Sequence, residues 1–530
     1  MHLIDAQSQA GVSDGAAAPP GERHSAHDLP AETFRKLGHE LVDQLADFLA
    51  TLRDKPVAPR DTPRELRMLL DGDLALPAEG ADPAAVLAEA THLVLSHSTF
   101  NGHPRFFGYI TSSAAPLGAL GDLLASAINP NVGAWALSPI ATEIERQTIR
   151  WIAELLGFPN ECGGLLVSGG NMANAVCAFA ALRVQAPWDK RALGLTGEGS
   201  APLALYGSSE THTWLDKFAD LSGLGTGSIR RVATDASGRI QPSALRTAIE
   251  ADRRAGVRPC MVVGTAGTVS TGAVDPLGDI QSVCKDFGVW FHVDGAYGAP
   301  AAGLPDAPEE LRALAGADSL AVDPHKWLYA PIEAGCVLVR DPANLQGAFS
   351  HHPPYYRFEG DAGDPPLNYY EWGPQNSRGF RALKVWLGLR HAGRTGVQRM
   401  IADDIALARS LHAHVASHPE LEPLTSNLSI TTFRYVPSDL RADLQSPEVG
   451  EYIDVLNEKL LAQLQSGGEI YLSNAIVGGR FALRACIVNF RTTERDVQAV
   501  PSIVVRAGMA VDAQIRPAGI PASSRASRPA

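Results

Sequence analysis

Between about residues 160 and 345, short runs rich in Val, Ile and Leu alternate with stretches whose apolar residues recur at helical spacing. The apolar runs are GLLVSGG, ALYGSS, MVVGTAG, VWFHVDGA, SLAVDP and GCVLVR. The helical stretches between them include ANAVCAFAALRVQ and LGDIQSVCKDFG. Strands that are buried on both faces and joined by helices form a mostly parallel sheet with crossover helices. The sequence therefore predicts an α/β fold for this region.

The regions on either side have a different texture. From Pro30 to Leu52, apolar residues at helical spacing predict an amphipathic helix with one buried face. A second helix is predicted from Pro139, with Ser138 as its N-cap and Gly157 as its stop. Its expected packing residues are Ile140, Ile144, Ile149, Ile152 and Leu156. After about residue 381, the helical stretch FRALKVWLGLRHAG precedes LSITTFRYV and ALRACIVNF, which are typical of strands in a smaller α+β domain.

These patterns divide the chain into five expected segments. The two ends are rich in Ala, Ser and Pro and cannot bury enough surface to order themselves, so they are predicted to be disordered. The segments are a tail at 1–28, an N-terminal helical segment at 29–110, a large α/β domain at 111–380, a small C-terminal α+β domain at 381–512 and a tail at 513–530.

Charge and composition exclude several kinds of partner. The 530 residues include 45 Lys and Arg against 58 Asp and Glu, a net charge of −13, which is the wrong sign for a protein that binds nucleic acid. No run reaches the roughly 18 apolar residues of a membrane helix. The six Cys form no C-x-x-C pair, and the N-terminus lacks the basic and apolar regions of a secretory signal. We therefore expect a cytoplasmic protein with free thiols.

Several common catalytic motifs are missing. The Gly-rich stretch 223–227 follows no strand and lacks the full dinucleotide-binding spacing, so it is interpreted as a loop. The sequence has no phosphate-binding GxxxxGK[ST] loop and no G-x-S-x-G elbow. His39-Glu40 is followed by Asp43 where a zinc hydrolase needs its second His. Neither a metal site nor a serine hydrolase is expected.

Three motifs remain, each at the end of a predicted strand, the edge on which open α/β sheets bind ligands. They are SGGNMAN at 168–174, HVDGAYG at 292–298 and DPHKW at 323–327. Taken alone, each has an ordinary explanation: a strand–turn–helix junction, a helix cap and a solvated Lys. Together they offer an anion-binding helix start, an acid and an amine, the protein groups that pyridoxal phosphate requires.

With these motifs the sequence closely resembles the group II pyridoxal-phosphate-dependent amino acid decarboxylases. The resemblance runs from about residue 30 to about 500 and includes HPRFF at 103–107, the segment 135–139 and Glu210-Thr211-His212. It implies the fold-type I architecture, with a large mostly parallel domain, a smaller C-terminal α+β domain and an N-terminal helical segment. It also implies an obligate homodimer, and the apolar helix at 34–49 is a plausible dimer element because it needs a surface to cover.

The resemblance assigns roles to residues of these motifs. Lys326 would carry the cofactor as a Schiff base, and Asp294 would pair with the pyridine N–H. Ala296 would lie under the ring, with Gly295 standing where the family usually has Ala. His212 matches the His that stacks on the cofactor.

The phosphate and the final proton transfer are assigned in the same way. The expected phosphate contacts are Ser168, Gly169, Gly170 and His325. Asp323 replaces the Asn common in the aromatic branch, and because a carboxylate repels phosphate it is not taken as a ligand. The family's loop Tyr, which protonates the α-carbon, aligns with Tyr355, although the adjacent Tyr356 is an alternative; Tyr355 could also be a packed loop aromatic.

The implied reaction is decarboxylation of an L-amino acid to an amine and carbon dioxide. Around Trp135 the alignment puts Ile110, Asn131 and Gly133 where aromatic-acid decarboxylases have bulky apolar residues, and Asn131 resembles the glutamate-type branch. We favour an aromatic substrate over a glutamate-like or other amino acid. Transaminating and aldehyde-forming relatives share the cofactor residues and remain alternatives. A cofactor-free binding module is disfavoured because Lys326, Asp294 and His212 occur together.

Overall fold

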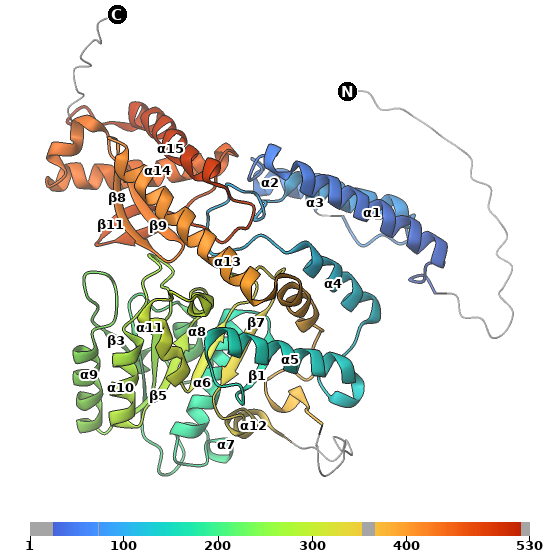
Figure 1. The fold of residues 1–530 in the computed structure, drawn as a ribbon, viewed down its shortest axis with the longest axis vertical. Coiled ribbons are helices and arrows are strands. Elements are labelled where there is room, and N and C mark those ends of the chain that lie inside the picture. The colour runs from blue at the N-terminus through green and yellow to red at the C-terminus, as the bar shows by residue number, and fades with distance from the viewer. Residues whose placement is uncertain (1–24, 73, 352–365, 521–530) are drawn as a thin grey trace, which may run out of the picture. The chain divides into compact units, whose positions relative to one another are not determined.

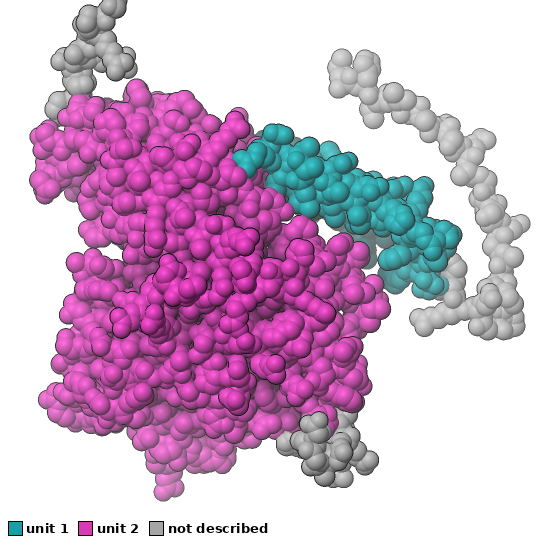
Figure 2. Space-filling model, viewed as in Figure 1, with its two compact units in different colours: residues 1–55, 61–98 teal, residues 56–60, 99–530 magenta. Residues whose placement is uncertain are grey.

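The computed structural model describes residues 25–72, 74–351 and 366–520 (Figure 1). The chain divides into two compact units, residues 1–55 with 61–98 and residues 56–60 with 99–530 (Figure 2). In the described part of the first unit the elements are α1 (Ala31–Thr51), the 3-10 turn η1 (Leu52–Asp54), α2 (Pro63–Leu69) and α3 (Pro83–His97). Thr62 and Glu65 form a reciprocal capping box that starts α2, and Asp82 caps α3. This unit is therefore helical.

Helix α1 lies where the apolar spacing predicts a helix, but among the described residues most of its large apolar side chains are exposed. Leu37 is its buried residue. The exposed large apolar residues of α1 are Phe34, Val42, Leu45 and Leu49. The expectation of one buried face is thus wrong for the single chain.

The second unit is built on a seven-stranded sheet in the order β1-β7-β6-β5-β4-β2-β3. Its strands are β1 (Gly163–Val167), β2 (Leu203–Ser208), β3 (Ile229–Val232), β4 (Arg258–Thr265), β5 (Trp290–Asp294), β6 (Ser319–Val322) and β7 (Gly335–Val339). The pairs from β6 to β3 are parallel, whereas β7 is antiparallel to both β6 and β1. The predicted α/β class with a mostly parallel sheet is confirmed. The register pairs Thr265 with Asp294, which puts both at the same level of the sheet edge.

Helices connect and cover these strands, as the alternating pattern predicts. They are α4 (Pro116–Ile128), α5 (Pro139–Leu156), α6 (Gly170–Gln185), α7 (Lys190–Leu193), α8 (Trp214–Leu221), α9 (Pro242–Arg254), α10 (Leu277–Phe287), α11 (Glu309–Arg312) and α12 (Ala343–Phe349). Helix α5 begins with Pro139 and ends at Gly157, whose φ of 68° terminates it. Ser138 makes no side-chain cap bond there. The expected packing role of Ile140 is wrong, because this side chain is 71% exposed in the first turn.

A second, antiparallel sheet follows, in the order β10-β11-β9-β8, with the long helices α13 to α15 (Figure 1). Its elements are α13 (Ala382–Ser417), β8 (Leu421–Asn427), β9 (Ile430–Tyr435), α14 (Pro447–Gly467), β10 (Ser473–Val477), β11 (Arg480–Cys486) and α15 (Glu494–Ile515). These elements enclose a second hydrophobic core, but the first half of α13, with Ala382, Val385 and Ile401, packs in the core of the large sheet. The proposed boundary near residue 380 stays a prediction. Helix α15 continues three residues beyond the proposed end of this domain at 512. Among the described helices, none combines the length and apolarity needed to cross a bilayer.

Candidate active site

A cavity of about 310 Å³ opens at the ends of β1, β4, β5 and β6, where the sequence analysis places its three motifs. Its lining residues are Ile110, Ser168, Gly169, Gly170, Asn171, Met172, Asn174, Glu210, His212, Thr265, Gly267, Val269, Asp294, Ala296, Tyr297, Asp323, His325 and Lys326. Every residue of the described chain that was predicted to be catalytic or to bind the cofactor lines this cavity. Tyr355 and its alternative Tyr356 lie outside the described residues.

The turn between β1 and α6 is tightly built from glycines. Gly169 has a φ of 139°, which favours glycine, and the Cβ of any side chain there would lie 3.3 Å from Cε1 of His325. A Cβ on Gly170 would lie only 2.6 Å from Oδ2 of Asp323. Because α6 begins at Gly170, its first N–H groups are free of helical partners and can bind an anion.

Asp294 is the last residue of β5 and is only 6% exposed. The indole Nε1 of Trp214 donates to its Oδ2 at 2.8 Å, and the N–H of Ala296 donates to its Oδ1 at 3.2 Å. Two donors on separate oxygens fix the plane of the carboxylate. A buried carboxylate held in this way attracts a cationic N–H on a bound ligand.

Two residues before Asp294, His292 is fully buried in a chain of hydrogen bonds. Its Nε2 lies 2.7 Å from Oδ1 of Asn174, and its Nδ1 lies 2.8 Å from Oγ of Ser319, which in turn accepts from Nε1 of Trp290. Burial lowers the pKa of His292 to about 4, so the imidazole is neutral at pH 7. It therefore does not compensate the charge of Asp294.

Lys326 follows β6 and points its amine at Asp323, with Nζ 3.0 Å from Oδ2. Asp323 is buried, and its Oδ1 has no hydrogen-bond partner among the described residues. Nδ1 of His325 lies 2.8 Å from the carbonyl oxygen of Ala334, and its Nε2 lies 3.9 Å from Asp323. An amine, an imidazole and a carboxylate thus meet on one wall of the cavity.

The residues after Lys326 are anchored by Asp404 on α13. Oδ2 of Asp404 accepts from Nε1 of Trp327 at 2.9 Å and from the hydroxyl of Tyr329 at 2.6 Å. The ring of Tyr297 stacks on Trp327, with centroids 5.0 Å apart. Burial raises the pKa of Asp404 to about 7, although both hydrogen bonds oppose this rise. The backbone that carries the amine is therefore held from two sides.

His212 lines the cavity and remains accessible to solvent. Partial removal of water lowers the pKa of His212, and the positive charge of Lys326 acts in the same direction, whereas Asp294 opposes both. Its Nδ1 lies 3.2 Å from the backbone N of Trp214, which fits an acceptor and therefore a neutral ring. A neutral, oriented imidazole can lie flat against a planar ligand.

Gly295 stands where the resemblance implies Ala, and the packing is tight at this position. A Cβ on Gly295 would lie 2.6 Å from Cβ of Ala299 and 2.7 Å from Cδ1 of Leu320. The neighbouring Ala296 nevertheless lines the cavity, as expected.

Several residues of the site were missed by the sequence analysis. Thr265 ends β4 beside Asp294 and could have been found as another residue at a strand end. Trp214 and Asp404 carry no local signal for these contacts, because their partners Asp294 and Trp327 lie 80 and 77 positions away in the sequence.

Two of the three residues singled out for substrate choice do not line the cavity, whereas Ile110 does. Oδ1 of Asn131 accepts from the backbone N–H groups of Gly133 at 3.0 Å and Arg378 at 3.1 Å. A Cβ on Gly133 would lie 2.1 Å from the carbonyl oxygen of Asn376. Both residues therefore shape a turn of the backbone.

The mostly parallel sheet, with an anion-binding turn, a buried acid and a lysine around one cavity at its edge, defines a pyridoxal-phosphate enzyme of the fold-type I class. The chain matches the family model "Pyridoxal-dependent decarboxylase conserved domain" over residues 63–436. It therefore belongs to the pyridoxal-dependent decarboxylases. This confirms the predicted family, fold class, cofactor and enzyme class, whereas the roles of individual site residues stay proposals.

Proteins of similar sequence or structure match this chain along nearly its whole length. An aromatic-L-amino-acid decarboxylase of Bacillus atrophaeus is 34% identical over 470 residues, 88% of this chain and 94% of the relative. A phenylacetaldehyde synthase of a Rosa hybrid cultivar is 30% identical over 484 residues, 90% of this chain and 94% of the relative. The crystal structure of Oryza sativa TDC with PLP and tryptamine superposes with a TM-score of 0.84 at 29% identity, covering 92% of this chain and 99% of that one.

The polar groups of the cavity, and the space beside its glycines, fit pyridoxal phosphate. Oγ1 of Thr265 is buried at the cavity and has no hydrogen-bond partner among the described residues, so a polar ligand atom can satisfy it. The space beside Gly169 and Gly170 is one that side chains would fill. The acid and the amine supply the two further groups that this cofactor needs.

Proposed function

We propose that this enzyme decarboxylates an aromatic L-amino acid to its amine and carbon dioxide, using pyridoxal phosphate held in the 310 Å³ cavity. The observation that carries the proposal is the meeting of Lys326, Asp294, His212 and the glycine turn around this one cavity. The parallel sheet brings the ends of its strands to one edge, and the side chains there are the amine, acid and imidazole that this cofactor needs.

Each residue would act on the cofactor or on the substrate. When bound, pyridoxal phosphate supplies an electron-accepting ring for the electrons left behind by carbon dioxide. Lys326 provides the amine that attaches the cofactor, and Asp294 holds a proton at the pyridine nitrogen. His212, which lines the cavity, would lie against the ring and orient it. Tyr355, by resemblance, delivers a proton to the α-carbon of the product.

The remaining cofactor contacts are proposed as in the sequence analysis. Ser168, Gly169, Gly170 and His325 would bind the phosphate, and Ala296 would pack under the ring. The buried Asp323 is paired with Lys326 and would not contact the phosphate.

The aromatic preference is supported by the named activity of the Bacillus relative and by the lining of the cavity. Ile110 and Val269 add apolar surface to its wall. The polar side chain of Asn131, which resembled the glutamate-type branch, does not line the cavity and accepts two backbone bonds. A charged substrate side chain gains no partner from it.

Aldehyde formation is a second candidate, favoured by the similarity to the Rosa phenylacetaldehyde synthase. The two outcomes differ in the fate of the α-carbon after carbon dioxide has left: a proton gives the amine, whereas oxidation by dioxygen followed by hydrolysis would give the aldehyde, ammonia and hydrogen peroxide. A proton donor at Tyr355 favours the amine, so we place decarboxylation first.

We also propose a homodimer in the cytoplasm. Helix α1 leaves Phe34, Val42, Leu45 and Leu49 exposed, and a second copy of the chain would cover such a face. The six cysteines are free thiols, which a reducing compartment preserves. Light scattering across a range of concentrations tests the dimer, and a fully active monomer would contradict it.

The test of the proposed function is an amine-release screen over the standard L-amino acids with added pyridoxal phosphate. Amine and carbon dioxide should form in equal amounts, fastest with Trp, Tyr, Phe or a hydroxylated relative. Aldehyde, ammonia and oxygen consumption are measured in the same reactions. Equal or faster turnover of glutamate contradicts the aromatic preference, and aldehyde as the main product favours the second candidate.

A further inference from the structure

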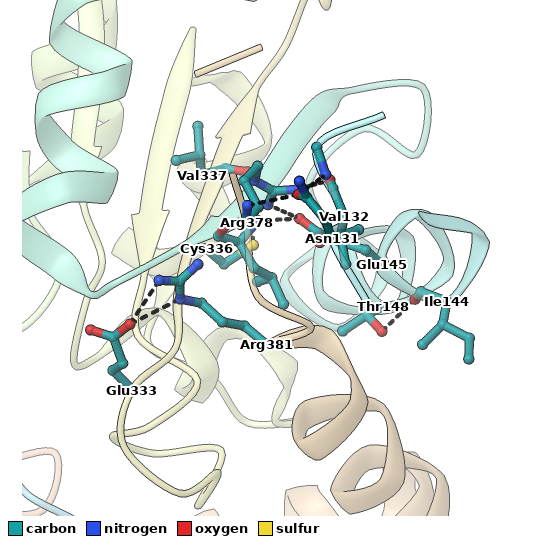
Figure 3. Close-up of polar contacts among 12 residues, drawn as sticks. Asn131, Val132, Ile144, Glu145, Thr148, Glu333, Cys336, Val337, Arg378 and Arg381 are labelled. Carbon is teal, nitrogen blue, oxygen red and sulfur yellow. Dashed lines mark hydrogen bonds and ion pairs between the residues drawn. The ribbon is translucent and has the colours of Figure 1, made fainter. Parts of the chain in front are cut away.

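A buried ion pair joins α5 to the segment that precedes α13 (Figure 3). Glu145 and Arg378 pair through Oε1 and Nη2, with their side chains 0% and 1% exposed. The ring of Tyr369 covers the guanidinium, 4.5 Å from centroid to Cζ. Removing two charges from water is costly, and such a pair is weak evidence for stability by itself. Its other hydrogen bonds therefore need an explanation.

Both members of the pair bind the backbone of Leu166 in β1. The N–H of Leu166 donates to Oε1 of Glu145 at 2.8 Å, and Nη2 of Arg378 donates to the carbonyl oxygen of Leu166 at 2.7 Å. Among the described strands β1 is at the edge of its sheet, next to β7. The ion pair thus satisfies the polar groups that an adjacent strand would otherwise bind.

Arg378 is itself held at both ends. Its Nη1 donates to the carbonyl oxygen of Val132 at 2.9 Å, and its backbone N–H donates to Oδ1 of Asn131 at 3.1 Å (Figure 3). In contrast, Oε2 of Glu145 and Nε of Arg378 are buried without a partner among the described residues. Some polar atoms of the pair therefore lack a hydrogen bond, whereas the two atoms that face Leu166 both form one.

We infer that Glu145 and Arg378 are positioning residues that hold the turn 168–170 in the geometry that receives the phosphate of the cofactor. Leu166 lies two residues before Ser168, so a change in its peptide orientation moves the start of the turn. Neither Glu145 nor Arg378 lines the cavity, and both act through Leu166. The inference rests on the proposed function, because it takes this turn as the phosphate site.

The experiment compares the dissociation constants of pyridoxal phosphate and of pyridoxal, which lacks the phosphate, for the full-length protein freed of cofactor. In Glu145→Gln the affinity for pyridoxal phosphate should fall about tenfold or more, equivalent to about 1.4 kcal/mol. The affinity for pyridoxal should change less than about twofold, because only the phosphate contacts are displaced. Glu154→Gln is the matched control: it also lies on α5 and pairs with an arginine, Arg394, but at an exposed site. It should leave both constants unchanged.

The outcomes separate the inference from the function on which it rests. Equal weakening of both ligands in Glu145→Gln, or no weakening of either, overturns the positioning role. A wild-type protein that binds pyridoxal phosphate no better than pyridoxal contradicts the phosphate site itself. If Glu145→Gln does not fold, Arg378→Lys replaces it with the same expectations, since Lys keeps the charge but not the fork of donors.

A measurement on the unmodified protein covers the case in which neither variant folds. Pyridoxal phosphate should slow amide hydrogen exchange at 168–170 and also at 376–378, because the ion pair couples the two segments. Slower exchange confined to 168–170 overturns the inference.

Discussion

Replacing Asp404 by Asn tests how the backbone around Lys326 is held. Asp404 is 2% exposed, and its Oδ2 accepts both from Trp327 and from Tyr329, the residues one and three positions after the lysine. Its amide replacement keeps an oxygen acceptor for these donors but cannot ionise. Asp404→Asn therefore separates the hydrogen bonds from the charge.

The magnitude follows from the raised pKa. Burial raises the pKa of Asp404 to about 7, whereas an Asp in an unfolded chain titrates near pH ~3.9. The folded protein thus binds this proton more tightly than the unfolded chain does. The contribution of this proton to the free energy of unfolding is fully present below about pH 4 and is lost as the pH rises to about 7. Above about pH 7 the group no longer makes the free energy of unfolding depend on pH. The interval from pH 5 to pH 7 covers about two pH units of this range, so the free energy of unfolding should fall by roughly 3 kcal/mol across it.

Urea unfolding at pH 5 and pH 8, with saturating pyridoxal phosphate, measures this effect. On raising the pH, the free energy of unfolding of the wild type should fall by about 3 kcal/mol more than that of Asp404→Asn. Asp403→Asn is the control, because Asp403 is the exposed neighbour on the same helix, and it should follow the wild type. If wild type and Asp404→Asn change in parallel with pH, Asp404 is not a proton-binding group in this range and the argument fails.

Three further substitutions test the proposed site. Lys326→Ala should give folded protein without covalently held cofactor; an adduct that borohydride still traps on the chain would disprove the assignment. Trp214→Phe removes the donor 2.8 Å from Asp294 and should lower kcat about tenfold, since a hydrogen bond to a charged group contributes about 1.5 to 3 kcal/mol; an unchanged kcat argues against this support. Tyr355→Phe should keep carbon dioxide release but shift the product from amine toward aldehyde, and an unchanged ratio would point to Tyr356, His212 or water as the acid.

The large sheet could be predicted because burial on both faces leaves a direct trace in the sequence. Strands such as β1 and β7 are buried along their whole length and appear as continuous apolar runs that begin with glycine. The carboxyl ends of parallel strands meet at one edge, so residues that follow different strands converge. For this reason the sequence alone places Asp294 and Lys326 at one cavity, which both of them line.

The supports of the site could not be predicted in the same way. Trp214 reaches Asp294 across 80 positions of sequence, and Asp404 reaches Trp327 across 77. Trp214 and Asp404 lie in helices, and the apolar periodicity of a helix indicates only that such a residue faces inward. Which partner it meets depends on how the helix packs, and no short-range pattern contains that information.

Asn131 shows the opposite error, in which a polar residue near a motif is taken for a ligand group. Its amide oxygen accepts from two backbone N–H groups, those of Gly133 and Arg378. Since buried N–H groups must be paired, the amide oxygen at this position is explained by the turn. A residue type therefore carries functional meaning only after its hydrogen-bonding capacity has been accounted for. By that criterion Thr265, whose buried hydroxyl lacks a partner among the described residues, is a better candidate for ligand contact than Asn131.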